Sequence, residues 1–313
     1  MSARLVACAA SAVLLAAGGL FADTRVERTI PLEPGGTFRL DTDVGSVTIR
    51  ARAGSGAHVL FTSRRDDFEE RFRLQFDQGA GTATVTARQR RHSVWFDNDR
   101  TRVDVTVEVP FETEVDVRTS GGAIALSATK RPARLRSSGG SLTVEDLDAG
   151  LDGDTSGGAV RIHGVTGNAR VRTSGGSIEV ARIRGSLDAD TSGGSVRVET
   201  VAGDVKAHSS GGPIHLRDVA GRVDAESSGG SADVAFARGN GKGGRIATSG
   251  GGITVSIDPS VGLEIDARAD SIHSDLPLTT RGSSRESLRG TLNGGGPSLR
   301  LDTNGGAVHI RAL

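Results

Sequence analysis

Four aspartates lie close together near the middle of the chain, in the stretch EDLDAGLDGD at 145–154. They are Asp146, Asp148, Asp152 and Asp154. Paired carboxylates are the usual catalytic groups of enzymes that cleave polysaccharides. However, arginines occur 18 positions before and after the last two aspartates, at Arg134, Arg136, Arg170 and Arg172. If these arginines lie beside the acids, the carboxylates are held in ion pairs and are not poised for proton transfer. The sequence therefore favours a non-enzymatic protein, with an exported carbohydrate-active β-helix enzyme (a polysaccharide lyase or hydrolase) as the alternative.

The histidines and serines offer no further catalytic or metal-binding pattern. No histidine pair has the spacing of a metal site with a carboxylate or cysteine partner. The histidines are His58, His92, His163, His208, His215, His273 and His309. We read His163 as part of a connecting turn and predict no metal and no cofactor. The serines of the repeated Ser-Gly-Gly lack an accompanying base, so we expect their hydroxyls to satisfy backbone groups at corners.

Phosphate and nucleic-acid binding are also disfavoured. The stretch GNGKGG at 239–244 lacks the spacing of a phosphate-binding loop, and we interpret it as a protruding turn that carries Lys242. The basic run RQRRH at 88–92 has no interleaved aromatic residues. Lys plus Arg equals Asp plus Glu at 38 each. With no net charge to attract a polyanion, we predict no nucleic-acid partner.

A repeat of 18 residues must position all of these side chains. Ser-Gly-Gly recurs at this step from Ser120 to Ser228, and again at Ser249 after 21 residues. Each unit contains two short segments in which apolar residues alternate, which predicts two strands per unit. Glycines mark the corners, where a positive φ or a close backbone approach favours glycine. This pattern fits either an antiparallel meander or a solenoid whose coils stack in parallel.

Alternating charge selects the solenoid. One outward position reads Arg134, Asp152, Arg170, Asp188, Lys206, Asp224 and Arg245 in successive units. Opposite charges one unit apart stabilise each other only if those residues are neighbours across strands, roughly 4.8 Å apart. The predicted fold is therefore all-β: a parallel β-solenoid (β-helix) of about 18-residue coils, with an N-terminal β cap and irregular C-terminal coils. The handedness and the number of faces stay open.

A second outward position supplies the candidate contact surface. It reads Arg161, Glu179, Arg197, His215 and Asp233 in successive units, to which we add Lys242 of the insertion turn. Large regular faces are the natural contact surfaces of a solenoid.

The sequence also predicts four segments. Residues 1–22 have the charge and apolar stretch of a signal peptide, which would remove Cys8 and leave a mature chain without a transmembrane segment. Residues 23–118 carry most of the phenylalanines and are expected to form an N-terminal β region and cap, in which 71–88 is a hairpin. Residues 119–247 are the regular solenoid, and 248–313 are C-terminal coils and a cap.

The Gly-Gly-x-Ile-x-Val coils, the stretch SDLPL and the closing GTLNGGGPSLRLDTNGGAVHI resemble the bacterial family of putative adhesins, a domain family of unknown function. This resemblance implies a β-solenoid located in the periplasm, the outer envelope or at the cell surface, and it offers no active site to transfer. We therefore expect an adhesin-like interaction or structural module whose partner is an envelope or surface protein or polymer.

Overall fold

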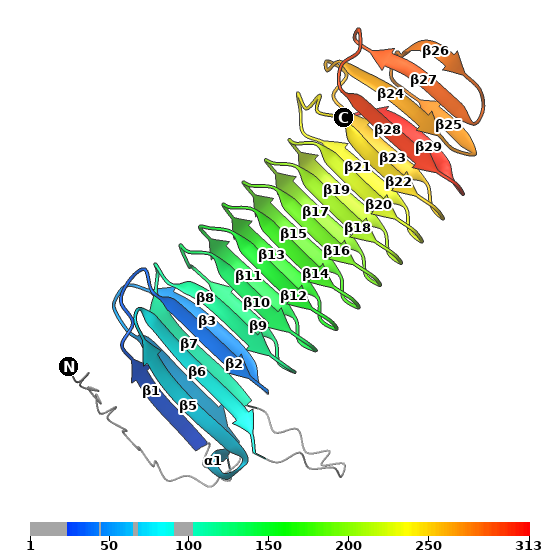
Figure 1. The fold of residues 1–313 in the computed structure, drawn as a ribbon. Coiled ribbons are helices and arrows are strands. Elements are labelled where there is room, and N and C mark those ends of the chain that lie inside the picture. Colours follow the sequence, from blue (N-terminus) through cyan, green and yellow to red (C-terminus); the bar gives the residue numbers. More distant parts are fainter. Residues whose placement is uncertain (1–23, 44, 65–67, 91–102) are drawn as a thin grey trace, which may run out of the picture.

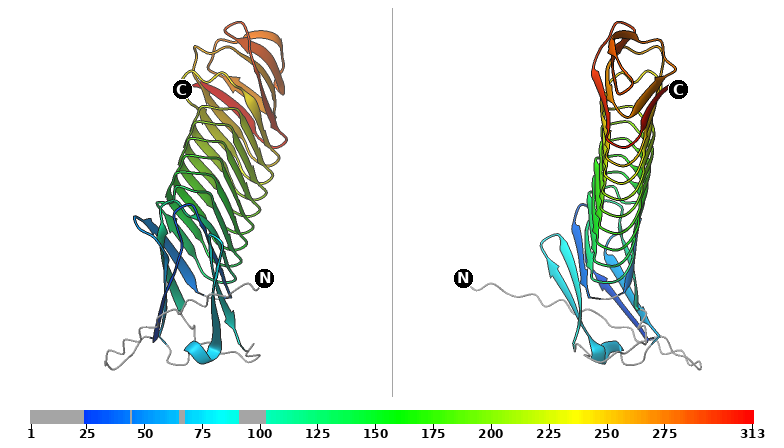
Figure 2. Two further views of the ribbon diagram at one scale, coloured as in Figure 1. Left: turned by 60° about the vertical axis from the view of Figure 1, so that its left-hand side comes forward. Right: turned by 90° about the vertical axis from the view of Figure 1, so that its right-hand side faces the viewer.

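The computed structural model describes residues 24–43, 45–64, 68–90 and 103–313. The predicted signal peptide, Cys8 and His92 lie outside these residues. The described residues form two long open sheets, named here sheet A and sheet B, and one four-residue helix, α1 (Phe68–Arg71). The two sheets face each other along an elongated stack (Figure 1; Figure 2).

Sheet A contains, in spatial order, β1 (Thr24–Ile30), β4 (Ala57–Ser63), β7 (Val103–Pro110), β3 (Ser46–Arg52), β9 (Ile124–Ser127), β11 (Leu142–Leu147), β13 (Val160–Val165), β15 (Ile178–Ile183), β17 (Val196–Val201), β19 (Ile214–Val219), β21 (Ala232–Phe236), β23 (Ile253–Ile257), β29 (Ala307–Ala312) and β25 (Ser271–Ser274).

Sheet B contains, in spatial order, β26 (Thr279–Ser283), β27 (Ser287–Leu292), β24 (Leu263–Arg268), β28 (Ser298–Thr303), β22 (Gly244–Thr248), β20 (Val223–Ser227), β18 (Val205–Ser209), β16 (Leu187–Thr191), β14 (Ala169–Thr173), β12 (Leu151–Thr155), β10 (Ala133–Ser137), β8 (Glu114–Thr119), β2 (Thr37–Thr42), β6 (Thr82–Gln89) and β5 (Phe72–Gly79).

Successive coils stack in parallel and in register, which confirms the predicted β-solenoid. Asp152 is the cross-strand partner of both Arg134 and Arg170. On the other sheet, Glu179 is the partner of both Arg161 and Arg197. Each regular coil contributes one strand to each sheet, so the coils have two faces, a point that the sequence left open.

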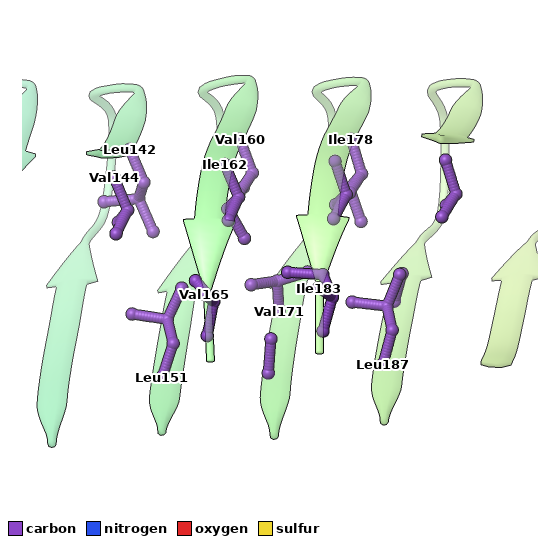
Figure 3. Close-up of a cluster of buried hydrophobic side chains, with 14 of the residues drawn as sticks. Leu142, Val144, Leu151, Val160, Ile162, Val165, Val171, Ile178, Ile183 and Leu187 are labelled. Carbon is purple, nitrogen blue, oxygen red and sulfur yellow. The ribbon is translucent and has the colours of Figure 1, made fainter. Parts of the chain in front are cut away.

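The core lies between the sheets and follows the alternation seen in the sequence. In one coil Ile178, Val180 and Ile183 point inward from β15, and Leu187 and Ala189 point inward from β16; all are 3% exposed or less. Figure 3 shows how such side chains from neighbouring coils form a continuous apolar layer. Together the five contribute about 7 to 15 kcal/mol by burial at most, while ordering the residues of a coil costs at least that much. A coil is therefore stable only within the stack.

The corner glycines are required for close approach, not for a positive φ. A Cβ at Gly176 would lie 2.1 Å from the carbonyl oxygen of Gly158, and one at Gly185 would lie 2.4 Å from that of Gly167. Positive φ occurs elsewhere, at the position that ends the straight part of the sheet A strands from β9 to β19. There Arg182 has φ 59° and Thr200 has φ 57°. One left-handed residue turns the chain and accounts for the break in alternation.

A second correction concerns the corner hydroxyls. The serines of Ser-Gly-Gly are exposed, and the residue before each of them is buried instead. In one coil, the Thr173 hydroxyl donates to the Gly158 carbonyl at 2.8 Å and accepts from the Gly176 amide at 3.1 Å. Strand alternation points this last strand residue inward, so it satisfies two backbone groups that would otherwise be buried without partners.

Both ends of the stack are interleaved. The first coil, β2 with β3, lies between a coil made of β6 and β7 and another made of β8 and β9. The last coil, β28 with β29, lies between the coil of β22 and β23 and the strands β24 and β25, which precede it in sequence (Figure 1). The predicted hairpin is confirmed as β5 and β6, which pair antiparallel. The four segment boundaries stay a prediction.

Candidate contact surface

Five of the six predicted contact residues form one column on the outer face of sheet A. Arg161, Glu179, Arg197, His215 and Asp233 come from β13, β15, β17, β19 and β21, and each is the cross-strand partner of the next. They point outward because their neighbours on each strand point into the core. The column therefore runs along the stack, perpendicular to the strands.

Charge pairing along this column is incomplete. Arg161 Nε lies 3.5 Å from Glu179 Oε2, and the Asp233 carboxylate lies 3.8 Å from Arg311 of β29. Between these two pairs, Arg197 is exposed and forms no ion pair with any residue that the structure describes. An exposed guanidinium without a partner is available to bind a carboxylate or phosphate from another molecule.

A second outward column lies beside the first, two residues further along each strand, and the sequence analysis missed it. It consists of Glu145, His163, Ala181, Glu199 and Arg217. His163 therefore lies within β13, and its assignment to a turn was wrong. The signal was present in the sequence as the position directly after the second apolar residue of each pair. It was obscured because the next residue has a positive φ in most coils, which lengthens the polar stretch.

Two hollows lie on this face along the two columns. One has a volume of about 390 Å³ and is lined by Arg161, Glu179, Ala181 and several neighbours, and the other, of about 230 Å³, is lined by His215, Asp233 and their neighbours. Both hollows include Arg197 and Glu199. Ala181 is the smallest side chain of its column, so the surface is lower there than at the coils above and below. We name the two columns with their hollows the sheet A contact surface.

Lys242 does not belong to this surface. It is exposed on the turn from β21 to β22, at the edge of the stack. The buried Asn240 side chain holds this turn by donating to the Val219 and Gly221 carbonyls at 2.6 and 2.9 Å. The Asp258 carboxylate accepts from the backbone and hydroxyl of Ser260 and from the Gly239 amide, and these hydrogen bonds lower the pKa of Asp258.

The four aspartates that the enzymatic alternative would use as catalytic groups lie in two separate places. Asp152 and Asp154 lie on the outer face of sheet B, where their carboxylates are 3.1 Å from Arg134 Nε and 3.6 Å from Arg136 Nε. Asp146 and Asp148 lie at the edge of the stack, where they line a separate hollow of about 530 Å³. Within the described part of the chain, no group of three or more His, Cys, Asp or Glu side chains could hold a metal ion.

These observations define the chemistry that the face can perform. The sheet A contact surface presents cations, carboxylates and two histidines on a rigid sheet, with spare hydrogen-bonding capacity at Arg197 and Glu199. Such an arrangement suits non-covalent recognition of a molecule that carries charges of both signs. None of the described helices has the length and apolar character needed to cross a lipid bilayer.

Comparison with known proteins identifies the family. The model of the Toastrack DUF4097 family matches residues 38–311, so the chain belongs to this family of unknown function. This confirms the family resemblance and agrees with the solenoid fold. Among proteins with curated descriptions, none matches the chain.

Several solved structures are similar in their strand arrangement. A putative adhesin from Bacteroides fragilis is 12% identical, with a TM-score of 0.40 over 94% of this chain and 99% of that chain. A putative cell adhesion protein from Clostridium sporogenes is 9% identical, with a TM-score of 0.28 over 93% of this chain and 100% of that chain. A putative lipid binding protein from Parabacteroides distasonis is 12% identical, with a TM-score of 0.34 over 92% and 96%. At these identities and TM-scores, the likenesses carry no argument about what this chain binds.

Proposed function

We propose that this protein is a non-enzymatic solenoid of the cell envelope that acts as an adhesin-like interaction or structural module through the sheet A contact surface. The observation that carries the proposal is the combination of an exposed cation and a nearby carboxylate at recessed positions of this face: Arg197 and Glu199 line both hollows, and within the described residues neither forms an ion pair.

The chemistry of the surface indicates the class of partner. Its two columns carry arginines, carboxylates and histidines but no Phe, Tyr or Trp. Sugar-binding platforms usually stack rings on such aromatic side chains. The partner that fits best is therefore an envelope or surface protein, or a polymer, with charged groups repeated along an extended segment.

The enzymatic alternative finds little support in the geometry. Catalysis of glycoside cleavage requires one carboxyl group that is protonated and a second that is free to act as base or nucleophile. Asp152 and Asp154 instead lie beside arginines of the adjacent coil, at 3.1 Å and 3.6 Å, and neither is paired with a second carboxyl group across a cleft.

Retention on native cell envelopes tests the proposed function. The double variant Arg197→Ala, Glu199→Ala should reduce retention about tenfold, which corresponds to about 1.4 kcal/mol of binding free energy. The matched control is Arg172→Ala, Asp190→Ala on sheet B, two exposed or half-buried residues whose replacement removes the same number of charges. Equal retention of both variants and the parent protein would overturn the assignment of this surface.

A second measurement addresses catalysis. Incubation with a panel of plant and bacterial polysaccharides should produce no chain cleavage. Cleavage that is abolished by Asp152→Asn or Asp154→Asn would replace the proposed function with the enzymatic one.

Export is the other element of the proposal. The charge and apolar stretch of residues 1–22 support it. Fractionation of the native cells, with N-terminal sequencing of the recovered protein, should find it in the periplasm, outer envelope or at the surface, beginning near residue 23. Recovery from the cytoplasm with residues 1–22 intact would contradict this.

A further inference from the structure

The outer face of sheet B carries its charges in stripes. The six sheet B strands β10, β12, β14, β16, β18 and β20 each present two outward residues with ionisable side chains. We name each such pair a charge row. The six rows are Arg134 with Arg136, Asp152 with Asp154, Arg170 with Arg172, Asp188 with Asp190, Lys206 with His208, and Asp224 with Glu226. Across these six strands, anionic rows alternate with rows that carry arginine or lysine, whereas rows beyond them, such as Asp116 with Arg118 on β8 and Arg300 with Asp302 on β28, contain both signs.

Stacking of the coils does not require this arrangement. Opposite charges one coil apart, about 4.8 Å away, would be equally well placed if the two columns alternated out of phase. Each row would then contain one cation and one anion about 6.6 Å apart on the same strand. The observed pattern instead places like charges side by side in five of the six rows, and it also gives Asp152 two arginine neighbours in the adjacent row, Arg134 at 3.1 Å and Arg136 at 3.9 Å. Stacking alone is therefore compatible with either arrangement and does not select the stripes.

The stripes are complementary to a second copy of the same face. We propose that two copies of this chain associate through sheet B, face to face and with their stacks antiparallel. A two-fold axis parallel to the strands, between the Arg170 row and the Asp188 row, places each row opposite a row of the other copy. The Arg170 row then faces the partner's Asp188 row, Asp152 faces Lys206, and Arg134 faces Asp224, so that every facing pair has opposite sign.

The stripes also select this orientation. If the two stacks ran parallel about a two-fold axis, each row would meet the same row of the other copy, and like charges would face each other. Columns that alternated out of phase would be complementary in both orientations. The like-charge rows therefore disfavour the parallel arrangement, and repulsion against a wrong arrangement is a general source of specificity.

Sheet A does not share this property. Its first column alternates in sign from Arg161 to Arg197, but the row of Arg197 and Glu199 contains both signs and the row of Glu179 includes the uncharged Ala181. Only sheet B is self-complementary, so the sheet A contact surface remains open for another partner in the associated pair.

The size of the face sets the expected strength. Six rows at about 4.8 Å, each on a strand of five residues at about 3.3 Å, cover roughly 500 Å² per copy. A standard stable interface buries about 800 Å² per partner. The pair should therefore be weak and should form at high local concentration, and its stability should fall as salt screens the charges.

Sedimentation of the full chain over a range of concentrations tests the proposal directly. A dimer should form at low salt and dissociate at about 1 M salt, where the Debye length is about 3 Å. Two variants then test charge complementarity. The first keeps only the cationic rows, with the six acids of the three anionic rows changed to the corresponding amides. The second keeps only the anionic rows, with Arg134, Arg136, Arg170, Arg172 and Lys206 changed to glutamine.

Each variant alone should be a monomer, and an equal mixture should form a one-to-one dimer. Neutralising one pair on sheet A, with Arg161→Gln and Glu179→Gln, is the matched control and should leave dimerisation within about twofold. Thermal melting by circular dichroism shows whether each variant is folded. A mixture of folded variants that stays monomeric, or a dimer that survives 1 M salt unchanged, would overturn the proposal.

A cross-link tests the orientation. In a Cys8→Ser background, Arg134→Cys and Asp224→Cys in the same chain should form two disulfides between copies upon mild oxidation. Within one copy these positions are five coils apart, about 24 Å, so they cannot join each other. Cross-linking by the double variant, and not by Arg134→Cys alone, is expected. Efficient cross-linking by Arg134→Cys alone would indicate the parallel arrangement and overturn the antiparallel one. If dimers form only with an added anionic polymer, the stripes bind that polymer and the second copy is excluded.

Discussion

Sheet A and sheet B are built from the same coils around the same core, yet their outer faces differ in how charge is used. On sheet B the sign alternates in every coil from Arg134 to Arg245, with ion pairs such as Arg170 to Asp188 at 3.0 Å. On sheet A the row of Arg197 and Glu199 contains both signs, and the uncharged Ala181 stands beside Glu179. The charge order of sheet B therefore carries the more regular signal for the stacking register, and that of sheet A is less constrained by stacking.

The ion pairs of sheet B contribute more to register than to stability. The Arg134 and Asp152 side chains are 52% and 34% exposed, so water and salt screen their attraction. Such pairs are worth about 0.2 to 1 kcal/mol each. If coils paired one unit out of register, however, residues of like charge would become cross-strand neighbours along the whole column.

The largest expected effect comes from the corner that both faces share. Gly176→Ala should lower the free energy of unfolding by about 3 kcal/mol, because the added Cβ meets the Gly158 carbonyl oxygen at 2.1 Å, an extreme case of overpacking. Urea denaturation measures this. Gly175→Ala is the matched control, since its Cβ would lie 3.5 Å from the Gly157 carbonyl oxygen, in ordinary contact. Equal losses from the two substitutions would show that close approach is not the reason for the glycine.

Charge reversal on sheet B should have an intermediate effect. Arg170→Asp places three carboxylates in one column with Asp152 and Asp188. We expect a loss of roughly 1 to 2 kcal/mol of unfolding free energy at low salt, from one lost ion pair and two new repulsions. High salt should recover most of this loss. An unchanged melting temperature at low salt would argue against charge as the determinant of register.

The same reversal on sheet A should have a smaller effect on the fold. Within the described residues Arg197→Asp breaks no ion pair and adds one repulsion, with Glu179, so the free energy of unfolding should fall by about 0.5 kcal/mol. Retention on cell envelopes should nevertheless fall, because the exposed cation is replaced by an anion. If this variant loses as much stability as Arg170→Asp, the two faces are equivalent and the comparison fails.

The smallest effect concerns the turn that carries Lys242. Hydrogen bonds from Ser260 and Gly239 lower the pKa of Asp258, so the carboxylate stabilises the fold above the ordinary aspartate pKa of about 3.9. This contribution is lost as the pH falls through the lowered pKa. The amide exchange rate of Gly239 should therefore rise in strong acid, and Asp258→Asn should remove that pH dependence. An identical acid profile in the variant would assign the change to another group.

The regular part of the fold could be predicted from the sequence because each coil repeats the same physical solution. The spacing of Ile178, Val180, Leu187 and Ala189 gave the two strands of a coil, and alternating charge gave their parallel stacking. The same argument identified the first outward column of sheet A, from Arg161 to Asp233. The second column, from Glu145 to Arg217, was missed because a left-handed residue such as Arg182 breaks the alternation. No local pattern reveals which of two adjacent residues ends the straight part of the strand.

The interleaved ends could not be predicted in this way. Nothing in the residues of β28 specifies that it pairs with both β22 and β24, since these contacts depend on strands far away in the sequence. For a similar reason, the sequence analysis assigned the hydrogen bonds to the corner backbone to the wrong hydroxyl, that of the Ser-Gly-Gly serine. Thr173 and the serine after it are chemically alike, and only the direction of the strand decides which hydroxyl is buried.

The position of β28 and β29 fixes the order in which the molecule can be completed. Synthesis proceeds from the N-terminus, so β24 to β27 leave the ribosome before the strands that join them to β22 and β23. Until residues 298–313 emerge, the terminal hairpin has no attachment to the rest of sheet B. A chain that stops short of these residues does not merely lose one coil; it leaves four strand edges without this partner coil, those of β22 and β24 in sheet B and of β23 and β25 in sheet A, and unpaired edges are sites for aggregation. Only a chain that includes residues 298–313 can therefore pair the facing edges of β22, β23, β24 and β25.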